Sequence, residues 1–386
     1  MSGEGGVRLC LYSPVSRGGA AWFVSALAMA MADAGAQIDF IAPPLEPANR
    51  EPVHPHIHRI FLPRGGGGAE GGNRFVRAIR SVWRIASTFP LLTRSRIGTR
   101  EFVVTFYDWL PIQIAQFLWF RMLGARITYI VHDVTPHAWR FPPGLIWLEK
   151  RLQRLSYRLP HRVVTLTQAA RRDLAENWRR SEGVYVIPHG AFDEGTSSPL
   201  PNSDSLLVFG MLRRNKNIVE AIEALRAMHG EAPGVEMVIA GARHVEDMGY
   251  WDECATHLEG MDGYVRTEIG FIEEDRLRLL LGHASAVVLP YDDFASASGV
   301  AILAAMSGRV LITTDVGGIG ELIAHGLRPV LIQRPVTKHS IADAIGRFRA
   351  LPQDERVNMA RDGRAAISDY LSWDRIGREY IRVIGG

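Results

Sequence analysis

Residues 289–322 read LPYDDFASASGVAILAAMSGRVLITTDVGGIGEL, and this stretch decides the fold of the second half of the chain. An apolar strand is expected to end at Leu289, a small-residue helix to cover 298–306, and a β-branched strand to cover 310–314. Another helix is expected to begin at 317–318. Because the first amides of a helix have no partner inside it, the two glycine-bearing turns predict a phosphate-binding cradle.

The composition is that of a folded protein with more than one domain. The chain has 386 residues, of which 47% are hydrophobic and 22% are charged, which excludes a disordered chain. Its two cysteines, Cys10 and Cys254, cannot form a disulfide framework, so a reducing cytoplasm is expected. No apolar run is long enough to span a bilayer and no signal-peptide pattern opens the sequence, so any membrane contact is expected to be peripheral.

Strand-like and helix-like segments alternate along the chain, which predicts an α/β fold with two parallel sheets and crossover helices. Besides those in 289–322, the expected elements are a helix over Ala20–Ala34 and strand-like segments at Arg8–Tyr12, Ile38–Ala42, Phe102–Phe106, Arg126–Val131, Arg162–Leu166, Val186–Gly190, Leu206–Phe209, Met237–Ala240 and Ala286–Leu289. The segment 193–204 has the composition of a linker. The sequence therefore predicts a first domain over 1–192, a second over 205–370, and a terminal segment over 371–386.

Basic residues are concentrated in two stretches, although the net charge is only +3. Residues 71–100 contain no Asp or Glu, and four arginines there follow helical spacing, namely Arg74, Arg77, Arg80 and Arg84. This pattern fits a helix lying on an anionic membrane or an ordinary helix with a solvated face, and the sequence does not decide between them. The second basic stretch covers 140–162. A nucleic-acid partner is not expected, because no nucleic-acid-binding module is present.

Residue for residue, 289–322 resembles the nucleotide-sugar-binding core of glycosyltransferases with the GT-B fold, which has two Rossmann-like domains. It resembles in particular bacterial exopolysaccharide and mannosyl-type transferases related to the group 1, family 4-like enzymes, which read LPY, then Ser-Gly, then a small-residue helix. The resemblance implies two domains facing across a cleft that holds the active site. It implies an acceptor-binding first domain, a nucleotide-sugar-binding second domain, and a last helix that crosses back to the first, which Ser-Trp-Asp at 372–374 matches. It also implies that four residues of the cradle bind the donor, namely Ser298, Gly299, Gly317 and Gly318.

The motif FGMLRRNKN at 209–217 extends the resemblance. It implies that Gly210, Arg213 and Lys216 bind the donor diphosphate, although the larger retaining family carries its arginine where this chain has Met211. Fixed cations would stabilise the charge that a diphosphate gains as it leaves. The alternative is a solvated loop with two basic residues.

Two carboxylates of the related retaining enzymes are missing from this chain. The positions where those enzymes carry glutamates hold Ser296 and Ala304. Glu321 is then a candidate for ribose recognition, and the resemblance favours an inverting reaction.

An inverting transfer needs a general base to deprotonate the acceptor. The candidates are His132, Asp133 and Asp108, which follow predicted strands of the first domain. The segment HDVTPH resembles a His-Asn-x-x-Pro-His segment of the subgroup and implies a site role for His132 and for His137 on the acceptor side. Asp133 is equally compatible with capping a turn. His189 resembles an interdomain position near the donor, or is a structural imidazole.

Two further patterns are weak. Gly18 and Gly19 begin a helix after the first strand without a complete dinucleotide fingerprint, and the resemblance places this turn near the acceptor or the donor diphosphate. Three imidazoles in HPHIH at 54–58 could bind zinc, but an exposed extended segment explains them as well. We therefore expect no metal and no cofactor besides the nucleotide-sugar substrate.

Three functions remain compatible with the sequence. The first is a nucleotide-sugar-dependent hexosyltransferase of bacterial exopolysaccharide or cell-surface polysaccharide assembly, acting on a saccharide acceptor, lipid-linked, from the cytoplasm or the inner face of the membrane. The second is a sugar-nucleotide epimerase of the same fold, and the third is an inactive nucleotide-sugar-binding partner protein.

Overall fold

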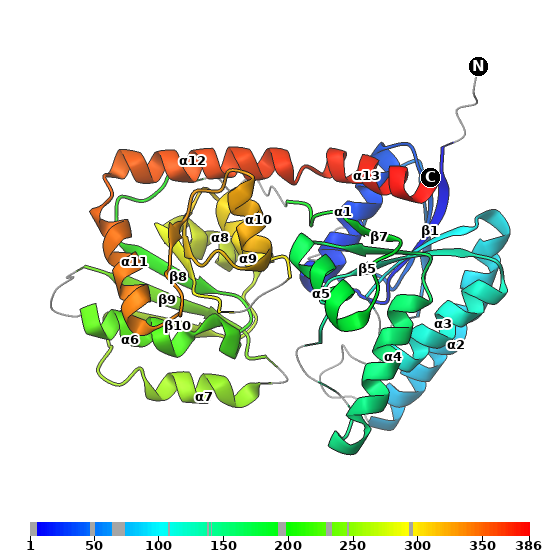
Figure 1. Cartoon of the computed structure of the whole chain (residues 1–386), viewed down its shortest axis with the longest axis horizontal. Coiled ribbons are helices and arrows are strands. Elements are labelled where there is room, and N and C mark those ends of the chain that lie inside the picture. Colours follow the sequence, from blue (N-terminus) through cyan, green and yellow to red (C-terminus); the bar gives the residue numbers. More distant parts are fainter. Residues whose placement is uncertain are drawn as a thin grey trace. The chain divides into compact units, whose positions relative to one another are not determined.

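A computed structural model describes residues 6–46, 51–63, 74–106, 109–136, 139, 141–191, 198–228, 234–244, 247–292 and 296–386. The chain divides into two compact α/β units (Figure 1). Unit 1 comprises Met1–Gly190 together with Trp373–Gly386, and unit 2 comprises Ala191–Ser372. Each unit is built around its own parallel sheet, which confirms the predicted fold class of two Rossmann-like domains.

Unit 1 contains a seven-stranded sheet in the order β3-β2-β1-β4-β5-β6-β7. The strands are β1 (Arg8–Tyr12), β2 (Gln37–Ala42), β3 (Ile57–Phe61), β4 (Glu101–Thr105), β5 (Arg126–Val131), β6 (Arg162–Thr165) and β7 (Val184–Val186). The helices are α1 (Gly18–Asp33), α2 (Arg74–Gly98), α3 (Leu110–Met122), α4 (Ile146–Arg158), α5 (Gln168–Trp178) and α13 (Trp373–Gly385). Because the strand order reverses between β1 and β4, the loops after these two strands border the crevice where such sheets bind ligands.

The last helix, α13, belongs to unit 1 and packs along α1 (Figure 1). A Cβ atom on Gly377 would lie 2.1 Å from the Ala30 carbonyl oxygen, so the approach of the two helices requires glycine. At the start of α13, the indole ring of Trp373 lies so close to Gly190 that a Cβ there would be 2.3 Å from it. These two contacts fix α13 against the rest of unit 1.

Unit 2 contains a six-stranded sheet in the order β10-β9-β8-β11-β12-β13. The strands are β8 (Ser205–Phe209), β9 (Glu236–Gly241), β10 (Val265–Ile269), β11 (Ala286–Leu289), β12 (Val310–Thr313) and β13 (Val330–Leu331). The helices are α6 (Ile218–Met228), α7 (Met248–Thr256), α8 (Glu274–His283), α9 (Gly299–Met306), α10 (Gly317–Ala324), α11 (Lys338–Ala350) and α12 (Gln353–Tyr370). Here the order reverses between β8 and β11, which places the second crevice beside the loops that follow them.

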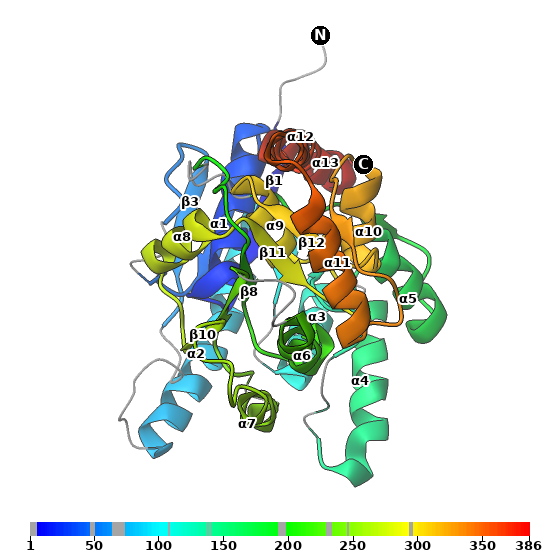
Figure 2. The same ribbon diagram turned by 90° about the vertical axis from the view of Figure 1, so that its left-hand side faces the viewer.

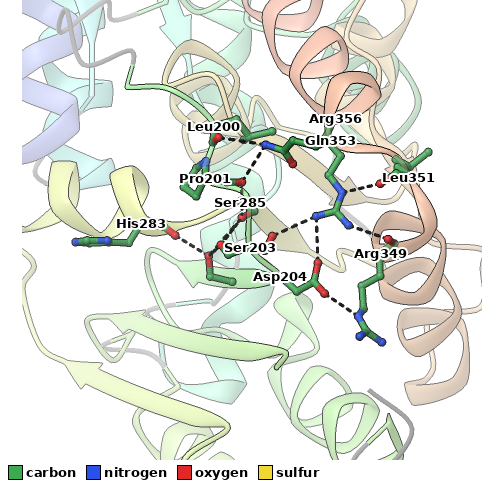
Figure 3. A network of polar contacts seen from close by, with 11 residues as sticks. Leu200, Pro201, Ser203, Asp204, His283, Ser285, Arg349, Leu351, Gln353 and Arg356 are labelled. Atoms are coloured by element: carbon green, nitrogen blue, oxygen red, sulfur yellow. Dashed lines mark hydrogen bonds and ion pairs between the residues drawn. The ribbon is translucent and has the colours of Figure 1, made fainter. Parts of the chain in front are cut away.

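The segment that enters β8 is fixed by partly buried polar contacts (Figure 3). The Arg356 guanidinium on α12 donates to the Ser203 carbonyl oxygen at 3.2 Å and to the Asp204 carboxylate at 3.1 Å. Arg349 on α11 donates to the same carboxylate at 2.9 Å. Charge-assisted hydrogen bonds of this kind are stronger than neutral ones, so β8 begins at a defined place in unit 2.

Most of the predicted strands are confirmed, and the two predicted helix starts in 289–322 occur at Gly299 and Gly317. Three strands were not predicted, β3, β10 and β13, and all three lie at sheet edges. β3 and β10 are only partly buried, so polar and charged residues interrupt their apolar pattern, and β13 has only two residues. The predicted strand at Phe102–Phe106 ends one residue earlier, because Phe106 adopts a positive φ of 59°.

The basic segment at 74–98 forms the helix α2, while the side chains of Arg74, Arg77, Arg80 and Arg84 lie outside the described residues. Among the residues described, no helix has both the length and the apolar character that crossing a bilayer requires.

The three imidazoles at 54–58 do not converge on one point. His54 Nε2 lies 3.4 Å from an Asp33 carboxylate oxygen, whereas His58 Nδ1 lies 3.0 Å from Asp39. Within the described ranges, no three His, Cys, Asp or Glu side chains are grouped to hold a metal ion.

Candidate functional site

The loop after β8 brings a buried ammonium group against the backbone. Lys216 Nζ donates to the Phe209 carbonyl oxygen at 2.6 Å. A Cβ atom on Gly210 would lie 2.8 Å from this nitrogen, and Gly210 has a φ of 101°. Glycine is therefore needed at position 210 both for the turn and for the approach of Lys216.

Burial changes the protonation of Lys216, whose exposed fraction is 5%. Desolvation, followed by repulsion from the Arg213 guanidinium, lowers the pKa of Lys216 to about 7. Arg213 Nε is buried and has no hydrogen-bond partner in the described part of the chain. The two cations thus lie close together, in a place where an anion would relieve their repulsion.

The neighbouring Arg214 does not share this role. Its guanidinium lies 2.7 Å from Glu253 and 3.5 Å from Asp247, and it stacks over the Tyr250 ring at 5.0 Å. Of the two arginines in the motif, only Arg213 is left to bind a ligand together with Lys216.

The first turn of α9 lies next to this loop. A Cβ on Gly210 would be 3.0 Å from Val300 Cγ2, and Asn217 Nδ2 donates to the Pro290 carbonyl oxygen at 2.8 Å. Buried Ser298 caps α9 by accepting from Ala301 N at 3.2 Å, and its hydroxyl lies 3.5 Å from the Tyr291 hydroxyl. The earlier amides of α9, those of Gly299 and Val300, precede the first intrahelical bond and are available to an anion.

The start of α10 supplies a second set of amides. Gly317 has a φ of 50°, and no side chain caps this helix. A Cβ on Gly320 would lie 2.8 Å from the Asp315 carbonyl oxygen, so this turn is tight. Gly318 is buried, and Glu321 is half-buried on the same helix.

Ser296 and Ala304 have different environments. Ser296 is half-buried before α9, whereas Ala304 is fully buried within it. Ala304 packs in the apolar cluster of Leu289, Ile302 and Leu311, so this part of α9 carries no carboxylate.

In unit 1, a half-buried imidazole lies at the carboxyl ends of β4 and β5. His132 Nε2 lies 3.0 Å from Thr105 Oγ1, and the ring stacks on Phe106 with centroids 3.9 Å apart. The edge of Phe23 from α1 covers it at 4.8 Å. Desolvation and the nearby His189 lower the pKa of His132 to about 3, so the ring is neutral near pH 7 and a weak base.

His189 lies in the same aromatic cluster. Its Nδ1 is 2.7 Å from the Gly190 carbonyl oxygen, which can only accept, so Nδ1 carries the proton. Its ring is 4.9 Å from Phe23 and 6.4 Å from Trp373. Burial lowers the pKa of His189 to about 4.

The remaining candidates of unit 1 differ in position. Asp133 follows His132 and its side chain is exposed. Gly18 and Gly19 begin α1, and a Cβ on either would meet no atom within 4 Å. Asp108 and His137 lie outside the described residues.

Four contacting residues were not predicted from the sequence, namely Thr105, Phe106, Asn217 and Tyr291. Thr105 ends β4 and Phe106 follows it, whereas Asn217 and Tyr291 lie in the motifs FGMLRRNKN and LPY, which were interpreted through other residues. Their roles come from contacts between loops that are distant in the sequence.

The arrangement has a clear chemical character in each unit. In unit 2, Arg213 and Lys216 follow β8 beside the start of α9, which follows β11, and the start of α10 follows the neighbouring strand β12; cations and helix-start amides are groups that can bind a polyvalent anion. Unit 1 presents an exposed carboxylate beside a neutral imidazole at its own crevice.

Comparison with known proteins gives a family for each unit. Residues 17–192 match the family model described as Glycosyltransferase Family 4, and residues 203–350 match the model described as Glycosyl transferases group 1. The chain is 27% identical over 186 residues to glycogen synthase of Mycobacterium tuberculosis, which covers 46% of this chain and 41% of that enzyme. It is 21% identical over 178 residues to the lipopolysaccharide 1,2-N-acetylglucosaminetransferase of Salmonella typhimurium, covering 45% of this chain and 46% of that enzyme. The chain thus spans less than half of the length of these curated relatives.

A solved structure shares the fold over nearly the whole chain. HepE of Anabaena, crystallised with UDP and glucose, superimposes with a TM-score of 0.71 at 15% identity, covering 98% of this chain and 99% of that one. The two family models lie on the two structural units, and the chain therefore belongs to the glycosyltransferases of the GT-B fold, in the group 1 and family 4 class.

Proposed function

We propose that this protein transfers a hexose from a nucleoside diphosphate sugar to a saccharide acceptor. The observation that carries the proposal is the pair of cations Arg213 and Lys216 beside the first amides of α9, at the point where the strand order of unit 2 reverses. A nucleotide sugar carries a diphosphate, which these cations and amides would bind. The UDP-bound relative of the same fold makes UDP-sugars the first donors to test.

The chemistry follows from the charge of the leaving group. When the bond between the sugar and the diphosphate breaks, negative charge grows on the diphosphate oxygens, and preorganised donors stabilise that charge. Arg213, Lys216 and the amides at the starts of α9 and α10 would supply this stabilisation. We propose that these groups replace a metal ion, so that activity in EDTA equals activity in Mg²⁺.

On the acceptor side we propose Asp133 as the general base of an inverting displacement. The neutral His132, held by Thr105 and Phe106, would orient the acceptor or the sugar. Inversion is proposed because the retaining relatives' two glutamates are replaced by Ser296 and Ala304. We further propose Glu321 for the ribose, His189 near the donor, and Gly18, Gly19 and His137 on the acceptor side.

The acceptor is proposed to be lipid-linked, in the assembly of a bacterial exopolysaccharide or another surface polysaccharide. The similarity to a lipopolysaccharide sugar transferase and the basic segment 74–100 support this proposal. The protein would then act at the cytoplasmic face of the membrane, in peripheral contact with anionic lipids.

One experiment separates the three candidate functions. The protein is incubated with UDP-, GDP- and dTDP-sugars, with and without a saccharide acceptor, and nucleotide release and sugar isomers are measured. Acceptor-dependent release of the nucleotide supports a transferase. Isomerisation without acceptor would indicate an epimerase, and a thermal shift without turnover would indicate a binding protein.

Donor affinity is expected to fall as the pH rises through about 7, because Lys216 has a pKa of about 7. Its pKa is depressed, so the charged form that attracts a diphosphate is present below that value and is lost above it. Calorimetry with the best sugar nucleotide between about pH 6 and 8.5 should show up to tenfold weaker binding per unit above pH 7. Lys216→Arg keeps the charge and should flatten the profile, whereas a steep profile in that variant would contradict the assignment.

Gly299→Val is expected to abolish measurable donor binding while the fold is retained. A Cβ at position 299 meets no protein atom within 4 Å, but a branched side chain there would occupy the space before the first α9 amides. The matched control is Gly249→Val in the first turn of α7, where a Cβ also meets no atom. Calorimetry decides, and unchanged affinity in a folded Gly299→Val protein would move the phosphate site elsewhere.

A further inference from the structure

The helix α4 exposes an apolar and basic face and buries a polar one. Its buried residues are Glu149, Gln153, Ser156 and Tyr157. The exposed residues Trp147, Arg151, Leu155 and Arg158 follow one another at helical spacing, and Trp147 and Leu155 are 54% and 37% exposed. A surface helix of a protein surrounded by water normally has the opposite arrangement.

Hydrogen bonds hold the polar face of α4 in the interior of unit 1. Gln153 Nε2 donates to the Tyr157 hydroxyl at 2.7 Å, and the Tyr157 hydroxyl donates to the Val134 carbonyl oxygen. The Glu149 carboxylate accepts from Phe141 N at 2.8 Å. Rotating α4 to bury Trp147 would break these buried bonds, so the exposed stripe is fixed by the fold.

The exposed face has unbalanced positive charge. Its exposed cations are Lys150, Arg151 and Arg158, for which no ion pair with a carboxylate is found in the described part of the chain, and Lys150 Nζ lies 5.3 Å above the Trp139 ring. Arg154 is half-buried. The Arg151 guanidinium lies 5.2 Å above the Trp147 ring, which holds the indole at the surface. Leu145, in the turn at Pro143–Leu145 that precedes α4, is also exposed.

The end of α4 that carries Trp147 projects from unit 1 in both views, and the N-terminal end of α2 projects on the same side (Figures 1 and 2). The N-terminal end of α4 is therefore a projecting part of unit 1.

We propose that α4 and the turn before it form a docking surface for a bilayer that contains anionic lipids. Trp147 and Leu145 would enter the headgroup region, where tryptophan is favoured, and the exposed cations Lys150, Arg151 and Arg158 would contact lipid phosphates and carboxylates. An anionic bilayer is favoured as the partner because its charge is opposite to that of the exposed face of α4. The only acidic residue of α4, Glu149, is buried. The inference rests on the proposed peripheral contact and assigns it to α4 rather than to the arginines of α2.

The test is co-sedimentation of the full chain with phosphatidylcholine vesicles with and without phosphatidylserine. Each charge near such a surface contributes about a fivefold factor, so R151E/R158E should weaken binding by more than about a hundredfold. Trp147→Ala should weaken it by about tenfold through lost burial. The matched control R171E/R172E reverses two exposed arginines of α5 and should bind nearly as the unchanged protein does.

Binding to the anionic vesicles alone, lost in the α4 variants and kept in the control, supports the proposal. Equal loss in the control overturns it, because net charge then suffices. A shift from dimer to monomer in Trp147→Ala without lipid overturns it in favour of an interface between copies. If vesicle binding is lost only when the charges of Arg74, Arg77, Arg80 and Arg84 are reversed, the assignment to α4 is wrong but the proposed peripheral contact stands. If every variant still binds the vesicles, both are wrong. Donor affinity, measured in parallel, reports separately on the transferase proposal.

Discussion

Lys216→Ala and Arg213→Ala are each expected to lower turnover by two or more orders of magnitude with the fold intact. Removing one well-placed donor from a preorganised site costs roughly 2.7 to 4 kcal/mol of transition-state stabilisation. Lys216→Ala also leaves the Phe209 carbonyl oxygen without its donor, so its stability must be measured. Arg213→Ala carries no such complication, since Arg213 Nε has no partner among the described residues.

Arg214→Ala is the matched control, because this arginine is in the same motif but is held by Glu253 and Asp247. Its turnover should remain within a few-fold of the unchanged enzyme. Initial rates of nucleotide release at saturating donor, with thermal melting to verify folding, decide the outcome. Near-normal turnover in both Lys216→Ala and Arg213→Ala would remove the donor-site assignment.

Asp133→Asn is expected to reduce turnover by roughly 10²- to 10⁴-fold and to leave donor affinity nearly unchanged. The substitution keeps the shape of the side chain but removes the proton acceptor. The low pKa of about 3 for His132 makes the neighbouring imidazole a poor substitute near pH 7. Asp173→Asn is the control, because this half-buried carboxylate accepts from Thr135, which is on the same loop as Asp133, at 2.9 Å and has no part in the chemistry we propose.

Proton NMR of the first product reports the stereochemistry of the same reaction. An anomeric configuration opposite to that of the donor is expected. Retention would refute the inverting mechanism, and an active Asp133→Asn enzyme would transfer the role of base to Asp108 or His132.

Local patterns in the sequence predict the two sheets well, because strands such as Arg126–Val131 are buried on both faces and read as apolar runs. The edge strands β3 and β10 cannot be predicted from apolar runs, because these half-exposed strands contain polar residues. The orientation of α4 cannot be predicted for a different reason. Its polar and apolar residues recur with helical periodicity, but this pattern does not show which face of the helix is buried. The buried face is decided by the hydrogen bonds that Tyr157 and Glu149 make with residues in other segments.

The candidate site is predictable where backbone geometry needs particular residues. Gly210 and Gly317 indicate turns with positive φ, and Ser298 indicates a helix cap. The sequence does not reveal that Lys216 is buried on the Phe209 carbonyl, or that Arg214 turns to α7 while Arg213 does not. Those differences arise from tertiary contacts and decide which basic residue can bind a diphosphate.

The discontinuity of unit 1 also affects how the chain folds during synthesis. The face of α1 that packs on Gly377 and Trp373 receives its partner only after all of unit 2 has left the ribosome. Until then, apolar residues such as Phe23 lack part of their final cover, whereas unit 2 is continuous in sequence and can fold as soon as it emerges. We therefore expect the chain to need protection from aggregation most during the period of synthesis when unit 1 still lacks α13.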